Sequence, residues 1–383
     1  MSQKLSVLQI IPHLDTGGAE VGCLALAKAL VGKGHRSIIA THSGRMVAHA
    51  IAAGIEILTL PVHSKSPLQI ARNAALLKSF VLAESIDVLH VRSRAPAWST
   101  SWLAKATCTP WVSTYHGTYK QQNLLKKKYN GIMTKADRII APSQFISNHL
   151  DKHYPECAAK VITIPRGIDL TIMHPPSSYQ AEKRELARFW EVSDQQRMIL
   201  LPARITRLKG HHVCIAAVNK IKDFLRDNHV QILFVGSTGS DAYLSELKQD
   251  ITNASLQDLI RFYDHCPHMQ HAYALAELVL VCSTQAESFG RIAVEAQAMG
   301  KGIIATDHGG CRETIKHGKT GWLVPPNDPT ALAERIKHAL SLPSDQLLSM
   351  AKEAQSWVTS AFDQIRMIDQ TVAIYQSLCQ KHD

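Results

Sequence analysis

The 383-residue sequence lacks any apolar run that approaches the roughly 18 residues needed to span a bilayer. It also lacks a signal-peptide pattern, because the segment 1–4 leads directly into a strand-like run. The eight cysteines form no C-x-x-C pair and are scattered, which is typical of reduced thiols and not of a disulfide framework. We therefore expect a cytoplasmic protein in which any membrane contact is peripheral.

The familiar signatures of cofactor and metal sites are missing as well. Gly17 and Gly18 follow the apolar run 5–11, but they belong to no G-x-G-x-x-G motif and no Walker lysine follows them. Neither a NAD site nor an ATP P-loop is therefore well supported. The segment 265–271 holds three histidines and a cysteine, yet no second cluster with ligand spacing accompanies it, so we expect no metal site.

The chain does show a regular alternation of strand-like apolar runs and helical patterns, without repeats or low-complexity segments. This alternation predicts an α/β protein with parallel, doubly wound sheets, which bind ligands at the carboxyl ends of their strands. The length predicts two domains, and the Pro- and Ser-containing segment 165–179 predicts a linker. The predicted strands are 5–11, 37–40, 55–60, 88–91, 111–112, 139–140, 161–164, 198–201, 230–235, 259–262, 278–281 and 302–305.

Positive charge is concentrated in the first half of the chain. Residues 1–165 hold 19 Lys and Arg against 8 Asp and Glu, a formal charge of +11, whereas residues 166–383 hold 23 against 24, a formal charge of −1. A field of positive sign attracts anionic partners and weakens with salt. Only this net charge suggests nucleic-acid binding, and no recognised binding motif supports it, so we expect no nucleic-acid partner.

The segment 287–300 carries the most informative chemical pattern. Glu287 and Glu295, with seven residues between them, flank a turn at Gly290 that predicts strand, loop and then helix. The two carboxylates would lie roughly 8–12 Å apart, which is far for one metal ion but suits the two ends of a nucleotide-sugar. Bare N–H groups at the helix start would face its diphosphate. The alternative is an amphipathic helix flanked by solvated acids.

Two cations, Arg204 and Lys209, follow the predicted strand 198–201 and precede another helical pattern. Arg offers a fixed fork of donors and Lys a compact charge, so the pair could hold a diphosphate and neutralise the charge that develops on it as it leaves. Alternatively, both are ordinary surface cations.

Further short motifs occur in order between about residue 5 and residue 330. They are Gly-Gly-Ala-Glu at 17–20, Ser-Thr-Tyr-His-Gly at 113–117, Ala-Asp-Arg-Ile-Ile-Ala-Pro-Ser at 136–143, Ile-Pro-Arg-Gly-Ile-Asp at 164–169, Arg204 with Lys209 and Gly210, the Glu287/Glu295 pair, Gly-Gly-Cys-Arg-Glu at 309–313 and Thr-Gly-Trp-Leu-Val-Pro at 320–325. This series resembles the retaining glycosyltransferases of family 4. The resemblance implies the GT-B architecture, in which two Rossmann-like, doubly wound parallel-sheet domains face a cleft.

The resemblance also implies a division of the chain. Residues 1–165 would form an acceptor-side domain and residues 166–345 the nucleotide-sugar-binding domain. Residues 346–383 would form C-terminal helices, one of which crosses back to the first domain.

Site roles follow from the same resemblance. Arg204 and Lys209 would bind the donor diphosphate, Glu295 the ribose hydroxyls and Glu287 a sugar hydroxyl near the reacting carbon. His116 would contact the donor sugar from the opposite domain, so that His116, Glu287, Arg204 and Lys209 are the expected catalytic group. The amides of Ser288, Phe289 and Gly290 would also bind the donor diphosphate, and those of Gly17 and Gly18 would approach the phosphates or the acceptor. Base recognition would involve backbone groups of the segment from Tyr263 to Cys266.

The sequence departs from the family pattern at two positions. Arg166 stands where Asn is frequent, and Ser288 stands where Gly often follows the first acid. These departures leave the implied chemistry intact but make the choice of donor harder to predict.

Two basic segments in the first half are possible acceptor contacts. Arg92 and Arg94 follow the predicted strand 88–91, where they would bind an acceptor phosphate or carboxylate, or else form structural ion pairs. The segment 119–133 predicts a basic amphipathic helix. Its apolar face would rest on a bilayer, or would simply pack on the core of an ordinary surface helix. The lysines of this segment are Lys126, Lys127 and Lys128.

Together these features predict a glycosyltransferase of the EC 2.4 class that moves a sugar, with retention, from a UDP- or GDP-linked donor to an acceptor hydroxyl. We expect no metal or other cofactor to be required, since the cation pair can stabilise the leaving group. The expected acceptor is a lipopolysaccharide, polysaccharide or other envelope glycan, with the enzyme in the cytoplasm or on the inner face of the membrane. A sugar-nucleotide epimerase of the same architecture is the alternative.

Overall fold

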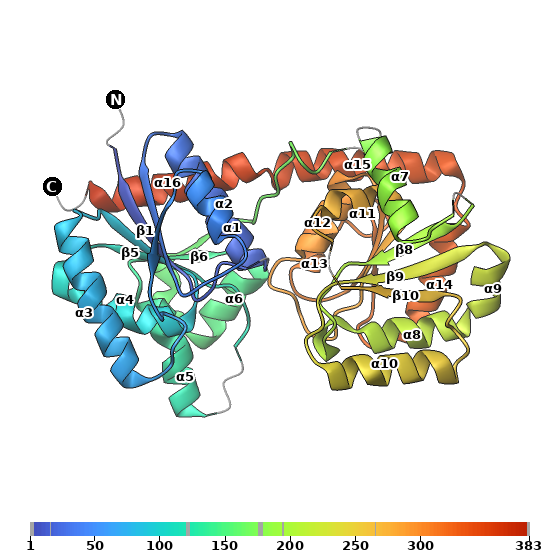
Figure 1. Ribbon diagram of the computed structural model, residues 1–383, viewed down its shortest axis with the longest axis horizontal. Coiled ribbons are helices and arrows are strands. Elements are labelled where there is room, and N and C mark those ends of the chain that lie inside the picture. The colour runs from blue at the N-terminus through green and yellow to red at the C-terminus, as the bar shows by residue number, and fades with distance from the viewer. Residues whose placement is uncertain are drawn as a thin grey trace. The chain divides into compact units, whose positions relative to one another are not determined.

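The computed structural model describes residues 4–15, 17–119, 123–174, 179–193, 195–264 and 266–380. The chain divides into two compact units (Figure 1). Unit 1 runs to Arg166 and resumes at Ile365, and unit 2 runs from Gly167 to Gln364. Each unit has its own parallel sheet with helices packed against it, as predicted for a doubly wound α/β protein.

Unit 1 is built on a seven-stranded sheet in the order β3-β2-β1-β4-β5-β6-β7, and each of the pairings between its strands is parallel. Its strands are β1 (Ser6–Ile10), β2 (Arg36–Thr41), β3 (Glu56–Thr59), β4 (Val88–Val91), β5 (Trp111–Thr114), β6 (Arg138–Ala141) and β7 (Val161–Thr163). Its helices are α1 (Gly18–Gly32), α2 (Val47–Ala52), α3 (Pro67–Ala83), α4 (Arg94–Thr107), α5 (Leu124–Asn130), α6 (Gln144–His153) and α16 (Gln364–Cys379).

The core of unit 1 follows from the period of two along its strands. On β1, Val7 packs in a cluster with residues of α1 and α16, whereas Leu8 and Ile10 pack in the cluster on the other face with residues of α3, α4 and α6. Successive strand residues point to opposite faces, so a run of apolar residues is expected where both faces are covered. Tyr375 fixes α16 on unit 1 through a 2.5 Å hydrogen bond between its hydroxyl and His90 Nδ1.

Unit 2 is built on a six-stranded parallel sheet in the order β10-β9-β8-β11-β12-β13. Its strands are β8 (Arg197–Leu201), β9 (Val230–Val235), β10 (Ile260–Tyr263), β11 (Leu278–Val281), β12 (Gly302–Thr306) and β13 (Trp322–Val324). Its helices are α7 (Gln180–Phe189), α8 (His211–Lys220), α9 (Lys222–Asp227), α10 (Asp241–Asn253), α11 (Met269–Leu275), α12 (Arg291–Ala298), α13 (Cys311–Thr314), α14 (Pro329–Leu340) and α15 (Ser344–Ala361).

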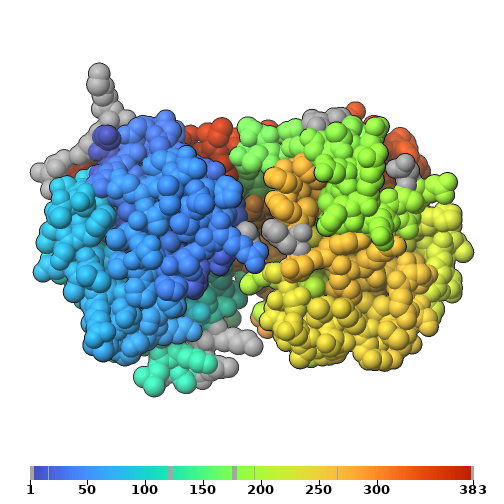
Figure 2. Space-filling model, in the orientation of Figure 1, coloured from blue at the N-terminus to red at the C-terminus, as the bar shows by residue number. Residues whose placement is uncertain are grey.

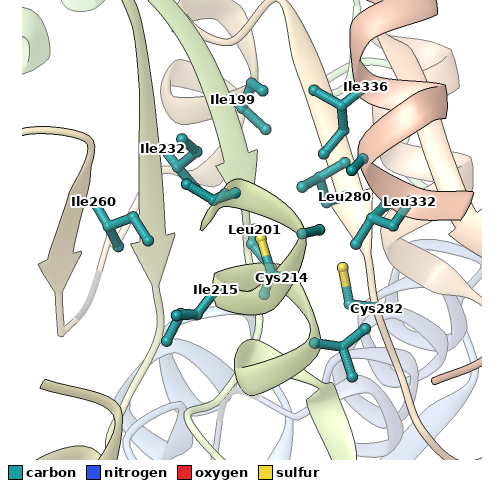
Figure 3. Packing of buried hydrophobic residues seen from close by; sticks show 14 of the residues in the cluster. Ile199, Leu201, Cys214, Ile215, Ile232, Ile260, Leu280, Cys282, Leu332 and Ile336 are labelled. Atoms are coloured by element: carbon teal, nitrogen blue, oxygen red, sulfur yellow. The ribbon is translucent and has the colours of Figure 1, made fainter. Parts of the chain in front are cut away.

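The same alternation builds the core of unit 2. Ile199 and Leu201 of β8 pack under α8 and α14, together with Cys214 of α8 and Leu332 of α14 (Figure 3). Met198 and Leu200 of the same strand belong to the cluster on the other face, which contains residues of α11, α12 and α15. The sheet is thus covered on both sides, and its ligand-binding potential lies at the edge where the strands end.

The strands confirm the predicted alternation, with one addition, and one predicted helix needs correction. The short strand β13 was not among the predicted strands, because three residues before Pro325 give too little periodicity. The predicted helix 119–133 is wrong in extent: α5 covers seven residues, residues 120–122 lie outside the described residues, and a 3₁₀ helix follows at Gly131–Lys135.

The predicted linker 165–179 is in part packed structure. Ile168 is buried, donates its N–H to the Phe362 carbonyl and forms a parallel bridge with Asp363. A Cβ on Gly167 would lie 2.3 Å from the Gln364 Cα, so only glycine fits where these two segments pass. The chain thus enters and leaves unit 2 through adjacent backbone segments. Among the described helices, none is long and apolar enough to cross a membrane.

Candidate functional site

The loops of unit 2 that carry the predicted site meet where the strand order reverses. β8 has β9 on one side and β11 on the other, so connections from these strands leave in opposite directions. The crevice that such a reversal creates at the carboxyl ends of the strands is the usual ligand site of a doubly wound sheet. Arg204 and Lys209 follow β8, and Glu287 follows β11. The structure therefore brings the two predicted motifs to the same edge.

The loop after β8 is held against the loop after β11 by backbone contacts. Thr284 donates its N–H to the Leu208 carbonyl over 2.9 Å. Gly210, the N-cap of α8, has φ +70°, and a Cβ there would lie 1.8 Å from the Cys282 carbonyl oxygen. Only glycine allows this approach. The backbone therefore fixes Lys209, in the 3₁₀ turn Arg207–Lys209, beside the β11 loop.

Lys209 and Glu287 form an ion pair at this point, with Nζ 2.5 Å from Oε1. The same Oε1 accepts a 2.6 Å hydrogen bond from the Ser283 hydroxyl. Burial alone would raise the pKa of Glu287, but the charge and hydrogen bond of Lys209, with help from Ser283 and His308, outweigh it and lower the pKa. Glu287 is thus a carboxylate whose Oε2 has no hydrogen-bond partner within the described residues.

Arg204 differs from Lys209 in its surroundings. Its side chain is exposed, and it has neither a hydrogen bond nor an ion pair with any residue that the structure describes. The loop after β8 therefore carries an exposed guanidinium whose charge no described residue balances. That arrangement suits an anionic ligand.

The predicted helix start at Gly290 is confirmed. Gly290 is the N-cap of α12 with φ +89°, Glu287 lies in the loop before it, and Glu295 lies in the second turn of the helix. The loop is packed tightly, because a Cβ on Gly310 would lie 2.4 Å from the Phe289 backbone and the Gly310 N–H donates to the Glu287 carbonyl over 2.8 Å. The open N–H groups of α12 therefore have a fixed direction.

The side chains next to Gly290 have different surroundings. Phe289 is 3% exposed and packs edge-on against Phe362, so its side chain belongs to the core and leaves only its backbone available to a ligand. Ser288 is partly exposed. The role of the Ser288, Phe289 and Gly290 amides in diphosphate binding stays a prediction.

Glu295, the predicted ribose ligand, is almost buried and has protein partners on both oxygens. Arg291 donates to Oε1 over 2.6 Å and the Tyr273 hydroxyl donates to Oε2 over 2.7 Å. A carboxylate has about four acceptor positions, so these bonds orient the group without exhausting its capacity. Sequence spacing did not indicate either donor, although Arg291 stands one turn before Glu295 on the same helix face.

The predicted base-recognition segment lies at the end of β10. The Tyr263 carbonyl accepts the Gly236 N–H over 2.9 Å, and the Tyr263 hydroxyl donates to the Trp190 carbonyl over 2.6 Å. The Cys266 thiol donates to the His268 carbonyl over 3.4 Å. His265 lies outside the described residues, so the predicted contact of this segment with a base stays a prediction.

His308 is a residue of this edge that the sequence reasoning missed. It precedes Gly309, follows β12, and is one of the neighbours that lower the pKa of Glu287. Both its ring nitrogens are buried without a hydrogen-bond partner among the described side chains and backbone groups. Its position directly before the Gly309-Gly310 pair is the sequence feature that could have identified it as a residue of this site.

In unit 1, His116 follows β5 and meets Arg166, whose Nη2 lies 2.6 Å from Nδ1 of the ring. A guanidinium can only donate, so Nδ1 accepts and the neutral ring carries its proton on Nε2. Burial lowers the pKa of His116 well below 6.5, and the charges of Arg166, Arg92 and His90 lower it further. Nε2 is buried and has no hydrogen-bond partner in the described part of the chain. His116 therefore presents one neutral N–H donor.

The predicted acceptor arginines are held by side chains of unit 1. Arg92 is 7% exposed and donates to Gln9 Oε1 over 3.1 and 2.8 Å. Arg94 donates to Asn130 Oδ1 over 2.7 Å and lies 3.8 Å from the centre of the Tyr119 ring. Neither forms an ion pair with a described residue, so the alternative prediction of structural ion pairs is wrong. Their partners are neutral amide oxygens and an aromatic ring. An acceptor contact by either arginine stays a prediction.

The predicted Gly17-Gly18 pair lies at the start of α1. Gly17 is the N-cap with φ −72°, so the backbone there is extended and needs no glycine. A Cβ on Gly17 would lie 2.4 Å from a carboxylate oxygen of Glu20, which is the end of a flexible side chain. The Glu20 carboxylate thus lies at this helix start, and the approach of the glycine pair to a ligand stays a prediction.

The lysines of the predicted amphipathic helix lie on α5, which projects from the surface of unit 1 (Figure 2). Lys126, Lys127 and Lys128 are exposed, and Leu125 is 79% exposed. Ile132 and Met133, predicted for the bilayer-facing side, are core residues instead. The expectation that these residues share one lipid-facing surface with the lysines is therefore wrong.

Metal ligands do not converge in the described part of the molecule. No group of three or more His, Cys, Asp or Glu side chains there could hold a metal ion. The histidine- and cysteine-containing segment noted in the sequence cannot be judged in full, because His265 lies outside the described residues.

Two family profiles match the chain along most of its length. The profile described as "Glycosyltransferase Family 4" matches residues 16–172, and the one described as "Glycosyl transferases group 1" matches residues 182–357. The two matches follow the division into units.

Individual relatives agree with these profiles. The crystal structure of a glycosyltransferase from Rickettsia africae ESF-5 is 32% identical in sequence, covers 98% of both chains and superposes with a TM-score of 0.89. D-inositol 3-phosphate glycosyltransferase 1 of Catenulispora acidiphila is 26% identical over 76% of this chain and 72% of its own length. The structure of Anabaena HepE in complex with UDP and glucose is 20% identical, covers 97% of this chain and 100% of that chain, and has a TM-score of 0.85.

Proposed function

Because the chain belongs to the group 1 glycosyltransferases of GT-B fold, we propose that unit 2 binds the diphosphate of a UDP- or GDP-linked sugar between Arg204, Lys209 and the start of α12. The enzyme acts on nucleotide sugars, and the proposal concerns which of its residues bind the donor. The observation that supports the proposal is the Lys209–Glu287 ion pair at the strand-order reversal, in the loop after β8 that also carries the exposed Arg204.

Each group at this edge has a distinct task in the proposal. Arg204 and Lys209 bind the two phosphates and stabilise the charge that grows on the departing diphosphate. The open N–H groups of α12 contribute at the same place. Glu287 accepts a hydrogen bond from a hydroxyl of the donor sugar through Oε2, while its Oε1 keeps Lys209 in place. Glu295, which is oriented by Arg291 and Tyr273, accepts hydrogen bonds from the ribose hydroxyls.

We further propose that transfer proceeds with retention by a front-side path. The acceptor oxygen forms its bond to the anomeric carbon on the face from which the diphosphate oxygen departs. The proton of the acceptor hydroxyl passes to a leaving phosphate oxygen. No protein nucleophile is needed, which agrees with a Glu287 carboxylate that is already bonded to Lys209 and Ser283. His116 supplies a neutral N–H donor to a sugar hydroxyl.

For the acceptor we propose an anionic glycan or lipid-linked precursor of a cell envelope. The formal charge of +11 on residues 1–165 and the exposed lysines of α5 support this class. One relative is named after a phosphorylated compound, D-inositol 3-phosphate, which agrees with an anionic acceptor. Flotation with anionic liposomes tests the membrane part: binding at low salt that is lost at high salt is expected, and no binding at low salt contradicts it.

A thermal-shift experiment tests donor binding. Nucleoside diphosphates and their sugars that bind the folded state raise its melting temperature, whereas the free nucleoside lacks the anionic bridge. We expect UDP or GDP to stabilise the protein and the matching nucleoside to have little effect. Equal effects of both would contradict the diphosphate assignment.

Product analysis separates the transferase from the alternative epimerase. A transferase leaves the donor sugar unchanged without acceptor, apart from slow hydrolysis. An epimerase converts it to a second sugar nucleotide without any acceptor, and that result would replace the present proposal.

A further inference from the structure

Three histidines of unit 1, His13, His42 and His63, lie in mutual contact. The ring centroids of His42 and His63 are 4.1 Å apart, those of His13 and His63 are 5.2 Å apart, and those of His13 and His42 are 5.7 Å apart. They follow β1, β2 and β3, which are neighbouring parallel strands. The three rings therefore meet at the carboxyl edge of the sheet, where doubly wound sheets bind their ligands. We call this group the histidine triad.

The loops that carry two of these rings are locked together. Leu14 donates its N–H to the Ser43 carbonyl over 2.7 Å, and His42 donates its N–H to the Pro12 carbonyl over 3.1 Å. Gly44 has φ +150°, and a Cβ there would lie 2.3 Å from the Leu14 backbone. Only glycine permits this approach, so the first two loops form one rigid platform.

No described carboxylate forms a hydrogen bond or an ion pair with the triad. Among the described side chains, the triad forms one hydrogen bond, between His13 Nδ1 and the Ser43 hydroxyl at 3.2 Å, and Nδ1 of His63 is buried without a hydrogen-bond partner there. Burial lowers the pKa of His63, and the charges of His42 and His13 lower it further. The other charged residues of these loops are Asp15, whose carboxylate accepts the Arg45 N–H, and the exposed Arg45 and Lys65.

A second feature of the same edge favours negative charge. The 15-residue helix α1 begins at Gly18, five residues after His13, with Gly17 as its N-cap and no side-chain capping hydrogen bond, and its first turn carries one acid, Glu20. The first N–H groups of a helix and its dipole attract anions. The triad and the dipole of α1 thus favour an anion at the same end of the sheet, and the Glu20 carboxylate in the first turn offsets part of the contribution of the helix.

We propose that His13, His42 and His63 form a recognition site for an oxyanion, a phosphate or a carboxylate, that the sugar acceptor carries. That the ligand is the acceptor rests on the proposed function, whereas the oxyanion site itself does not. Protonated imidazoles at this spacing repel one another, and a bound anion offsets the repulsion. Binding therefore takes up protons and tightens as the pH falls through the range in which histidine titrates.

Residue-resolved NMR of the full-length protein with labelled histidines tests the site. Glucose 6-phosphate, glucuronate and glucose serve as matched phosphate, carboxylate and neutral probes. We expect at least one of the two anions to shift the signals of the triad and to bind roughly tenfold more tightly at pH 6 than at pH 7.5, because about one proton is taken up. The anion that binds identifies the group on the acceptor. Glucose should leave the triad unchanged.

His42→Gln removes one imidazole from an exposed position, and His49→Gln, on the exposed side of α2, is the matched control. His42→Gln should lose most of the pH-dependent anion binding, and His49→Gln should bind as the parent does. The proposal is overturned if neither anion shifts the triad or if His42→Gln binds like the parent. If the triad bound an anion but the protein transferred sugar from no nucleotide sugar, the proposed function would be contradicted and the oxyanion site would stand.

Discussion

Arg166 donates through Nη2 to Nδ1 of His116 over 2.6 Å, and Arg166 is the last residue of unit 1 before the chain enters unit 2. The tautomer of His116 therefore depends on the residue that sits at this boundary. Arg166 occupies a position where the resemblance led us to expect Asn, and the structure gives that departure a physical consequence. A cation here both fixes the proton on Nε2 and disfavours a second proton on the ring.

Substitution of Arg166 should change the protonation of His116 in a predictable way. Arg166→Gln keeps an N–H donor but removes the charge, so Nδ1 stays an acceptor and the pKa of His116 rises. Arg166→Glu offers an acceptor instead, so the proton moves to Nδ1 and the imidazolium becomes favoured. The ¹⁵N shifts of the His116 ring between pH 5 and 8 measure both changes. Arg72→Gln, on the exposed side of α3, is the control, and identical His116 shifts in all variants would exclude the coupling.

Lys209→Ala should reduce sugar transfer by at least about 100-fold, the usual cost of losing one donor to a developing negative charge. The variant should also lose about 1–3 kcal/mol of unfolding free energy, because Glu287 is left nearly buried without its partner. Adding Glu287→Gln should restore part of that stability but none of the activity. Urea denaturation and product formation measure the two effects separately.

The control for this experiment is Lys248→Ala, which removes an exposed lysine of α10 in the same unit. It should match the parent in both measurements. If Lys209→Ala transferred sugar at the parental rate, the assignment of Lys209 to the diphosphate would be wrong.

Gly210→Ala should be more harmful than an ordinary substitution of a glycine with positive φ. Gly210 and Gly318 have similar φ values of +70° and +75°, but a Cβ at Gly210 meets the Cys282 carbonyl at 1.8 Å whereas nothing lies within 4 Å of one at Gly318. Gly318→Ala should cost about 1 kcal/mol of unfolding free energy from backbone conformation alone. Gly210→Ala should cost clearly more and weaken nucleotide binding through Lys209. Equal losses would mean that the β8 and β11 loops are not in close contact.

Stability should fall as the pH drops below about 6.5, before carboxylates begin to titrate. Burial lowers the pKa of His211 from 6.5 to about 4. Between these values the unfolded chain binds a proton that the folded chain does not, so stability rises with pH in this window and is lost as the pH falls. The loss should be roughly 2 kcal/mol for His211 between pH 7 and pH 5. Urea titrations of the parent and of His211→Gln check this, and parallel pH profiles would contradict it.

Much of the fold was predictable from local sequence pattern. Continuous apolar runs such as 278–281 predicted strands buried on both faces, and Gly290 predicted the start of α12, because these features act within a few residues. Strand β13 was missed because a three-residue strand has almost no periodicity of its own. The segment 119–133 showed a helical pattern, but Ile132 and Met133 are apolar because they fill the core of unit 1.

The partners within the site could not be predicted in the same way. Lys209 and Glu287 are 78 residues apart and meet because β8 lies next to β11 in the sheet. Tyr273 reaches Glu295, and Gln9 holds Arg92, by the same kind of long-range placement. The histidine triad is spread over three loops and forms no motif in the sequence. Such contacts depend on strand order, which the spacing of residues along the chain does not encode.

The central claim, that Arg204 and Lys209 bind the donor diphosphate, is tested most directly by a crystal structure of the protein with a bound UDP- or GDP-sugar. We predict phosphate oxygens within hydrogen-bonding distance of Lys209 Nζ and the Arg204 guanidinium, in front of the first turn of α12. A diphosphate bound away from both cations would contradict the account.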